Sequence, residues 1–461
     1  RQRKGYGPFT TVPALKKNVL SYLGNVTKRS LSVALRLSSL LRAGVVAGVA
    51  LAAVIYPLTA LGGLGVKTAI DLVNNLPTSL TSMPPAQTTY VYAADGETLL
   101  TTFYEEHRRY TPISEISPYM QQAIVASEDA RFFEHNGVDP KGVARAFVAN
   151  SQAGGVEQGA STLTMQYVRM ALRDGARSVT EAYAATEQTT ARKVREARLA
   201  AEVEKRMSKT EILEQYLNRA YFGHRAYGVY AAAEIYFSKK PADLTLTEAA
   251  MLAGLVQAPS EYDPASHDQT AATERRNWVI DRMVQLGYVS PKVAEEEKAK
   301  PIELDLTDPP HDCVSVPRER NDWGFFCDLF RNWWMSQPAF GETPLERADA
   351  LRRGGYRVIT SLDPEIQSIA QRHVVAKEPI GSPYAHGTVV VEPGTGLVKA
   401  MALNRVYSLD QSGNGPHTNW YADAETVSNY PNTVNPMLGG GDLPGYQAGS
   451  TFKWFVLLTA L

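Results

Sequence analysis

A stretch of 24 residues without a charged side chain, residues 43–66, sets the strongest limit on how this chain can fold. It is long enough to cross a bilayer as one helix, and its internal Pro57 and paired glycines are tolerated in membrane helices. A cleaved signal peptide is the alternative, but the preceding tail is longer than the charged region of such a peptide. We therefore expect a transmembrane helix at residues 43–66.

The charges on either side of this stretch predict its orientation. Residues 1–42 contain nine Lys or Arg and no Asp or Glu, whereas the rest of the chain has 38 basic and 48 acidic residues. A basic tail is typical of proteins that bind nucleic acid or an anionic membrane, and the adjacent apolar run favours the membrane. By the positive-inside rule the tail is cytoplasmic, and the residues after the span lie outside. We expect no nucleic-acid partner.

The remaining sequence is long enough for more than one domain. Residues 67–89 include a Pro-, Ser- and Thr-rich segment that predicts a stalk. Residues 90–289 are assigned to one mainly α-helical domain. It opens with a hairpin that turns at Asp95-Gly96, and its helices begin at capping-box pairs such as Ser208 with Glu211.

Residues 290–354 are expected to form a linker or insert with the two cysteines of the chain, Cys313 and Cys327. In an oxidising compartment such a pair is expected to form a disulfide, with two free buried thiols as the alternative. A zinc site is disfavoured, because His311 is the only other soft ligand nearby. Residues 355–461 alternate strand and helix signals, including a helix capped by Asp363, and predict the start of an α/β domain.

Glu196 lies on the apolar face of a predicted helix from Arg192 to Met207. A carboxylate there must line a cavity, meet a cation or have a raised pKa. The alternatives are a solvated edge of the stripe and a structural ion pair with Arg192.

Two further segments have the composition of a catalytic site. Glu128 and Asp129 end a predicted helix next to aromatic and basic residues and His135, which suits acid–base catalysis, although an acidic pair is usually surface. Ser161 and Thr162 precede a helix that carries Gln166 and Arg169, which suits an anion site; an ordinary capped loop is the alternative. The sequence has no metal-ligand cluster and no nucleotide-binding loop.

Together these segments resemble the class A penicillin-binding proteins. The resemblance rests on SEDARFFEHNGVD, QGASTLTMQYVRMAL, and RKVREARLAAEVEKRM with the residues that follow it. It implies a lysozyme-like α-helical glycosyltransferase domain, followed by the N-terminal part of an α/β serine transpeptidase domain. The implied activity is the polymerisation of lipid II into β-1,4 glycan strands at the bacterial cell membrane, with inversion of the donor linkage.

The resemblance also assigns roles to residues of this chain. Glu128 is implied as the general base and Glu196 as an assistant at the donor diphosphate. Substrate contacts are implied for Asp129, His135, Ser161, Thr162, Gln166, Arg169, Arg192 and Lys193. No cofactor is obligatory, although Mg²⁺ or Mn²⁺ could accompany the diphosphate. Expected ligands are lipid II, the growing glycan strand, and inhibitors of the moenomycin and β-lactam types. Other cell-wall or division proteins are candidate partners.

Near residue 461, Ser450 and Lys453 form an S-x-x-K motif in front of an apolar helix. A lysine three residues along a helix can activate a serine nucleophile, and the resemblance implies a penicillin-sensitive D,D-transpeptidase. The Ser-x-Asn and Lys-Thr-Gly elements of such a site are expected after residue 461. Two alternatives stay open: a lysozyme-like hydrolase, which would not need the anchor or the basic cluster, and a non-catalytic wall-assembly scaffold, which would not need both glutamates.

Overall fold

The computed structural model describes residues 80, 84–145, 161–176, 178–266, 268–316, 322–416, 428–438, 445–446 and 449–461. The chain divides into two compact units, residues 1–76 and 77–461, and every described residue belongs to the second. The expected cytoplasmic tail and transmembrane helix, and most of the expected stalk, lie outside the described residues. Within the described ranges, no helix has both the length and the apolar character that a membrane span needs.

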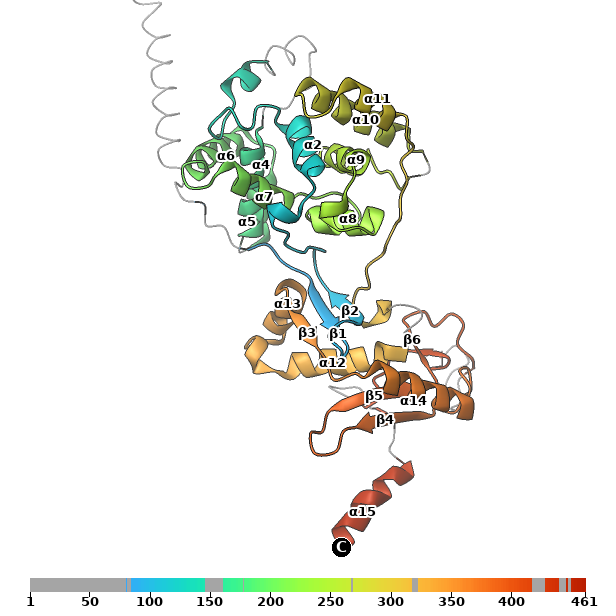
Figure 1. The fold of residues 1–461 in the computed structure, drawn as a ribbon. Coiled ribbons are helices and arrows are strands. Elements are labelled where there is room, and N and C mark those ends of the chain that lie inside the picture. The colour runs from blue at the N-terminus through green and yellow to red at the C-terminus, as the bar shows by residue number, and fades with distance from the viewer. Residues whose placement is uncertain are drawn as a thin grey trace, which may run out of the picture. The chain divides into compact units, whose positions relative to one another are not determined.

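The first hydrophobic core is built by helices (Figure 1). Helix α9 is buried along most of its length and packs against α2 and α10, so it lies at the centre of this core. The helices are α2 (Pro118–Glu128), α4 (Leu163–Asp174), α5 (Val179–Thr186), α6 (Thr190–Val203), α7 (Lys209–Leu217), α8 (Val229–Phe237), α9 (Leu246–Leu255), α10 (Thr270–Gln285) and α11 (Pro291–Lys298).

Side-chain caps fix where several of these helices begin. Ser208 and Glu211 form the predicted capping box at α7, and an equivalent pair opens α9. The hydroxyl of Thr162 accepts a hydrogen bond from the first turn of α4. Ser117 precedes α2, but its hydroxyl donates to the carbonyl of Leu244 at 2.8 Å and does not cap the helix. The predicted helix from Arg192 to Met207 ends earlier than expected, at Val203.

The second core contains a three-stranded sheet in the order β2-β1-β3. Strands β1 (Thr89–Tyr92) and β2 (Leu99–Phe103) form the predicted hairpin, and Gly96 adopts a φ of 72° in its turn. Strand β3 (Arg357–Ile359) pairs with β1 in parallel. Helices α12 (Gly324–Ser336) and α13 (Pro344–Arg353) and the Cys313–Cys327 disulfide complete this core.

These two cores divide the chain differently from the expected domains at residues 90–289 and 290–354. The hairpin packs in the second core, whereas Ala294 of α11 packs in the first. Residues 290–354 thus contribute to both cores. Hydrophobic patterning does not predict this division, because it shows which face of an element is buried and does not show which distant segment covers it.

The part after β3 has the strand–turn–strand and capped helix that the sequence predicts. Strands β4 (Gly387–Val391) and β5 (Val398–Leu403) pair antiparallel, and α14 (Pro364–Lys377) packs against β5 with Asp363 as its cap. The remaining elements are β6 (Val406–Tyr407), β7 (Asn432–Thr433), α15 (Lys453–Ala460) and 3-10 helices at Ile113–Glu115, Pro241–Asp243, Cys313–Ser315, Pro338–Phe340 and Gly449–Phe452.

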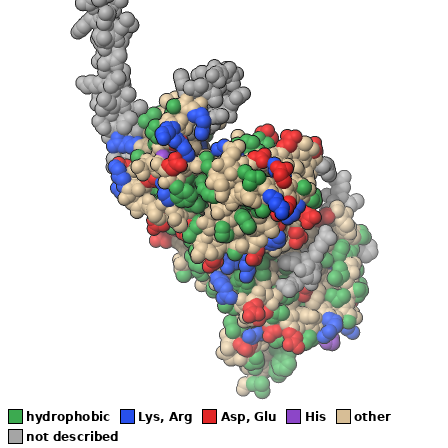
Figure 2. Space-filling model, turned by 45° about the horizontal axis from the view of Figure 1, so that its top comes forward, with side chains coloured by type: hydrophobic (Ala, Val, Ile, Leu, Met, Phe, Trp, Pro, Cys, Tyr) green, Lys and Arg blue, Asp and Glu red, His purple; other side chains and the backbone are tan. Residues whose placement is uncertain are grey.

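Figure 2 shows basic and acidic side chains intermixed on the visible face of the described residues, with apolar side chains between them. This face has no large region of one charge sign. On this face, a site for an anionic substrate would depend on individual cations and not on a broad charged surface.

Candidate active site

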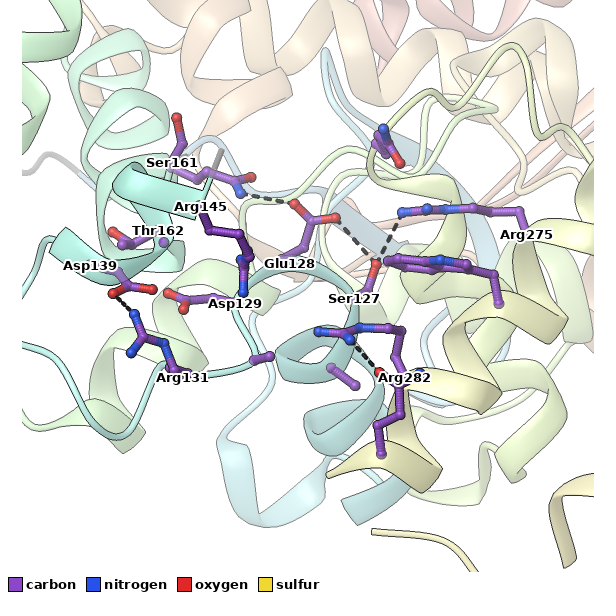
Figure 3. A pocket seen from close by; sticks show the side chains of 17 residues that line it. Ser127, Glu128, Asp129, Arg131, Asp139, Arg145, Ser161, Thr162, Arg275 and Arg282 are labelled. Atoms are coloured by element: carbon purple, nitrogen blue, oxygen red, sulfur yellow. Dashed lines mark hydrogen bonds and ion pairs between the residues drawn. The ribbon is translucent and has the colours of Figure 1, made fainter. Parts of the chain in front are cut away.

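A cavity of about 680 Å³ opens in the helical part, where the end of α2 meets the start of α4 and one face of α10 (Figure 3). A cavity of this volume can enclose a substrate of several sugar-sized groups. The sequence-predicted residues on its wall are Glu128, Asp129, Ser161, Thr162 and Gln166. Segments that are separate in the sequence thus meet at one cavity.

Glu128 is the last residue of α2, and both of its carboxylate oxygens have donors. The Gln166 side-chain amide donates to Oε2 at 2.9 Å. The Ser127 hydroxyl lies 3.4 Å from Oε1, and it is also 3.3 Å from the carbonyl oxygen of Ala253. A hydroxyl has one hydrogen, so these two acceptors compete for it. The hydrogen bond to Oε1 is therefore weaker than the hydrogen bond to Oε2.

Burial raises the pKa of the Glu128 carboxyl. The amide of Gln166 opposes this shift most strongly, and Arg275, Ser127 and Arg169 oppose it to smaller extents. A carboxylate with a raised pKa removes a proton more readily than a solvated one, because its conjugate acid is less acidic. Glu128 therefore has the surroundings that a general base needs.

Asp129 and His135 pair with each other. One Asp129 oxygen accepts from His135 Nε2 at 2.8 Å and from the amide of Leu163 at 3.0 Å, and both side chains are buried. Leu163 is the first residue of α4, so Asp129 joins the end of α2 to the start of α4. Asp129 also lines the cavity, whereas His135 is not on its wall. Asp129 therefore fixes the start of α4 against the end of α2, and this keeps Gln166 of α4 at hydrogen-bond distance from Glu128.

The segment expected to bind anions is described only from residue 161 onward. Thr162 uses its hydroxyl within the fold: it accepts from the amide of Met165 at 3.1 Å and donates to the carbonyl of Gly137 at 2.6 Å. Ser161 is half-buried on the cavity wall. The start of α4 faces this cavity, and its positive dipole end favours a negative group there.

The structure does not bring Glu196 to the Glu128 cavity. Glu196 is fully buried, and its Oε1 forms an ion pair with Arg192, so the structural pair considered from the sequence is the one observed. Its second oxygen, Oε2, is buried without a hydrogen-bond partner. The neighbouring Lys193 is exposed, and Arg169 is half-buried. Of these basic residues, Arg169 is the one that acts on the pKa of Glu128.

Three functional candidates on α10 were not identified from the sequence. Arg275, Trp278 and Arg282 line the cavity, and the Arg275 guanidinium lies 4.1 Å from the centre of the Trp278 ring. Arg275 Nη2 also donates to Ser127 Oγ at 3.3 Å. The spacing of three and four residues between Arg275, Trp278 and Arg282 places all three on one face of α10. That spacing was a usable signal, although alone it also fits an ordinary solvated face.

Other acidic side chains on the wall already have partners. Asp139 forms an ion pair with Arg131, as Figure 3 shows, and Asp129 is bound as described above. Across the part of the chain that the structure describes, no three His, Cys, Asp or Glu side chains gather in a way that could hold a metal ion. Glu128 is thus the carboxylate best placed for proton transfer.

Ser450 and Lys453 lie in the α/β part. Ser450 is in the 3-10 helix Gly449–Phe452, Lys453 begins α15, and both side chains are exposed. Helix α15 buries none of its residues and exposes Trp454 and Phe455. The motif therefore lies at the start of a helix, as predicted, and both of its side chains are exposed among the described residues.

The Transglycosylase family model matches residues 95–284, which include Glu128, Gln166 and Arg275. The chain is 36% identical to penicillin-binding protein 1A of Escherichia coli over 284 residues, which are 62% of this chain and 30% of the relative. The chain belongs to the class A penicillin-binding proteins. The resemblance drawn from the motifs is thereby confirmed.

Two other class A relatives extend the comparison. Penicillin-binding protein 1A of Aquifex aeolicus is 34% identical and aligns with 66% of this chain and 38% of its own length. Penicillin-binding protein 2D of Bacillus subtilis is 34% identical and aligns with 71% of this chain and 44% of its own length. The chain thus spans less than half the length of each of these penicillin-binding proteins.

Proposed function

We propose that this penicillin-binding protein polymerises lipid II into β-1,4 glycan strands of peptidoglycan, with Glu128 as the general base. The observation that carries this proposal is the setting of Glu128. It lies on the wall of a cavity of about 680 Å³ inside a transglycosylase domain, and burial raises the pKa of its carboxyl.

In the proposed step, Glu128 removes the proton of the acceptor sugar hydroxyl as its oxygen attacks the anomeric carbon of the donor. The bond from that carbon to the diphosphate breaks, and the diphosphate leaves with the electron pair. A hydroxyl is a poor nucleophile until its proton is removed, so the base acts during the attack. Gln166 orients the carboxylate by donating to Oε2.

Arg169, Arg192, Lys193 and the start of α4 are proposed to hold the glycan and the donor diphosphate. Cations and helix N-termini stabilise the negative charge that develops on such a leaving group. Glu196 would act there through Arg192, which it holds by an ion pair. The described residues form no cluster of three ligands that could hold a metal ion by themselves. A Mg²⁺ or Mn²⁺ ion would enter with the diphosphate.

A lysozyme-like hydrolase is less well supported by the same cavity. Glycoside hydrolysis needs two carboxyl groups on opposite sides of the scissile bond. Among the described residues of the cavity wall, the second carboxylate would be Asp129, which holds His135 and the start of α4, or Asp139, which holds Arg131. A non-catalytic scaffold gives no reason for a half-buried carboxylate with a raised pKa on a cavity wall.

The proposal has two further parts. Ser450 and Lys453 would supply the nucleophile and its activating amine in a β-lactam-sensitive D,D-transpeptidase, as the S-x-x-K motif and the names of the relatives suggest. Residues 43–66 would anchor the chain in the bacterial cell membrane, with the helical part outside near the lipid substrate.

The deciding experiment is incubation of the purified protein with lipid II, followed by separation of the products by glycan length. We expect long glycan from the wild type and a loss of about 10²- to 10⁴-fold for Glu128→Gln. Glu134→Gln is the matched control, because Glu134 is exposed in the same segment and lies off the cavity wall. Near-normal polymerisation by Glu128→Gln, or cleavage of finished glycan by the wild type, would contradict the proposal.

A further inference from the structure

Glu128 is connected to a buried tyrosine on a third helix. The hydroxyl of Tyr216, on α7, donates to Oε1 of Gln166, on α4, at 3.2 Å. The other end of the Gln166 amide donates to Glu128 Oε2 at 2.9 Å. Tyr216 is 0% exposed, so its hydroxyl cannot exchange this contact for bulk water. Three helices are thus joined by two consecutive hydrogen bonds.

The direction of these bonds follows from the chemistry of the groups. Burial strongly raises the pKa of the Tyr216 phenol, which therefore keeps its proton and can donate it. An amide oxygen only accepts and an amide NH₂ only donates. When the phenol donates to the oxygen of Gln166, the NH₂ group is left to face Glu128. An ionised carboxylate can only accept, so this arrangement suits the charged form of Glu128.

We propose that Tyr216 is a positioning residue for the base: by occupying the amide oxygen of Gln166, it keeps the NH₂ group turned toward Glu128 and so holds Glu128 ionised and oriented. This inference rests on the proposed role of Glu128. It adds a buried residue that lies off the cavity wall and cannot touch a substrate there.

Besides Gln166, charged groups also act on the pKa of Glu128. Arg275 approaches from α10 and Arg169 from α4, and both lower the pKa of Glu128. These guanidinium groups remain protonated at any ordinary pH, so their effect on the pKa of Glu128 does not change across the pH range. Asp129 is adjacent and bound to His135. The remaining charged residues on the cavity wall are Arg131, Asp139, Arg145 and Arg282.

Removing only the hydroxyl, with Tyr216→Phe, should release the Gln166 amide. The amide can then turn its oxygen toward Glu128, and that contact is favourable only when the carboxyl carries a proton. The protonated base is inactive. We therefore expect the acid limb of the pH–rate profile for polymerisation to move to higher pH by about one unit. Much of the rate should be recovered at alkaline pH.

The experiment measures the rate of glycan formation from lipid II between about pH 5 and about pH 9 for wild type and Tyr216→Phe. Tyr167→Phe is the matched control: Tyr167 is also buried, on the same helix as Gln166, and its hydroxyl faces Met207 Sδ at 4.0 Å. It should leave the acid limb in place. A merely structural role for Tyr216 would lower the rate at all pH values without moving the limb.

A second arm tests whether Tyr216 acts through Gln166. In a Gln166→Met background, adding Tyr216→Phe should produce no further shift of the limb. An independent, additive shift would overturn the inference. If Tyr216→Phe fails to fold, 3-fluorotyrosine at position 216 keeps the ring and is a stronger donor. It should move the limb to lower pH, and an unmoved limb would contradict the proposal.

Failure of this inference and failure of the proposed function give different results. If the wild type forms no glycan, or Glu128→Gln remains active, the role of Glu128 itself is wrong. If Glu128→Gln is inactive but Tyr216→Phe keeps the wild-type pH profile, Glu128 is the base and Tyr216 does not control it.

Discussion

Gly254 and Arg275 touch where α9 and α10 pack together: a Cβ atom on Gly254 would lie 2.9 Å from Cγ of Arg275. Glycine inside a helix is less stable than alanine by about 0.5–1 kcal/mol, so its presence here has to be explained by packing. The missing side chain lets Arg275 lie close along α9, with Nη2 at 3.3 Å from the Ser127 hydroxyl. Ser127 in turn lies next to the base, Glu128.

We predict that Gly254→Ala displaces Arg275 and slows polymerisation by up to about 100-fold, because small misplacements near a reacting group are costly. The loss in the free energy of unfolding should be smaller than the overpacking cost of about 1–3 kcal/mol, because alanine is a better helix former than glycine. Glycan formation and thermal unfolding measure the two effects. Gly413→Ala is the control, because a Cβ there meets nothing within 4 Å. Unchanged activity of Gly254→Ala would show that Arg275 does not support the base.

The raised pKa of Glu128 predicts how stability depends on pH. A carboxyl with a higher pKa in the folded than in the unfolded state binds more protons when folded, so its contribution to stability falls as pH rises between those two values. Glu128→Gln removes this cost. We expect it to raise the Tm near pH 7 while abolishing polymerisation, and to leave the Tm unchanged below the unfolded pKa of about 4. A lower Tm for Glu128→Gln near pH 7 would contradict the assigned direction.

Glu196 and Arg192 give a test that separates folding from turnover. Glu196→Gln leaves the buried Arg192 charge without its partner, and we expect a loss of about 3–5 kcal/mol in the free energy of unfolding. The double variant Arg192→Leu/Glu196→Leu removes both charges and should recover most of that stability. If the pair serves the donor diphosphate, turnover stays low in the double variant. Full recovery of turnover would leave the pair a purely structural role.

Local structure could be predicted well from the sequence because it depends on neighbouring residues. The capping box at Ser208, the cap at Asp363 and the turn at Asp95-Gly96 each involve contacts within a few residues. Glu128 and Gln166 could be named as site residues through their motifs. Those predictions needed no knowledge of how the helices pack.

Contacts between distant segments could not be predicted in the same way. Strand β3 pairs with β1 of the hairpin, and no local pattern at Tyr90 identifies Arg357 as its partner. Arg275 was missed because an arginine on a helix is usually solvated, and its contact with Ser127 joins two helices that are far apart in the sequence. Glu196 lies on the apolar face of its helix. From the sequence, that position is equally compatible with a side chain that lines a cavity and with one that forms a buried ion pair.

Ser450 and Lys453 form the S-x-x-K motif at the start of α15. Both are exposed in the described structure, and α15 presents Trp454 and Phe455 to solvent. An exposed lysine loses little hydration and gives little help in removing the serine proton, and acyl transfer also needs donors aimed at the developing oxyanion. We therefore expect a polypeptide of residues 1–461 to be labelled by a fluorescent penicillin only slowly and in low yield, while it still polymerises glycan. Ser450→Ala and a heat-denatured sample give the background labelling. Rapid, stoichiometric labelling that is lost in Ser450→Ala would show that these two residues suffice for acylation.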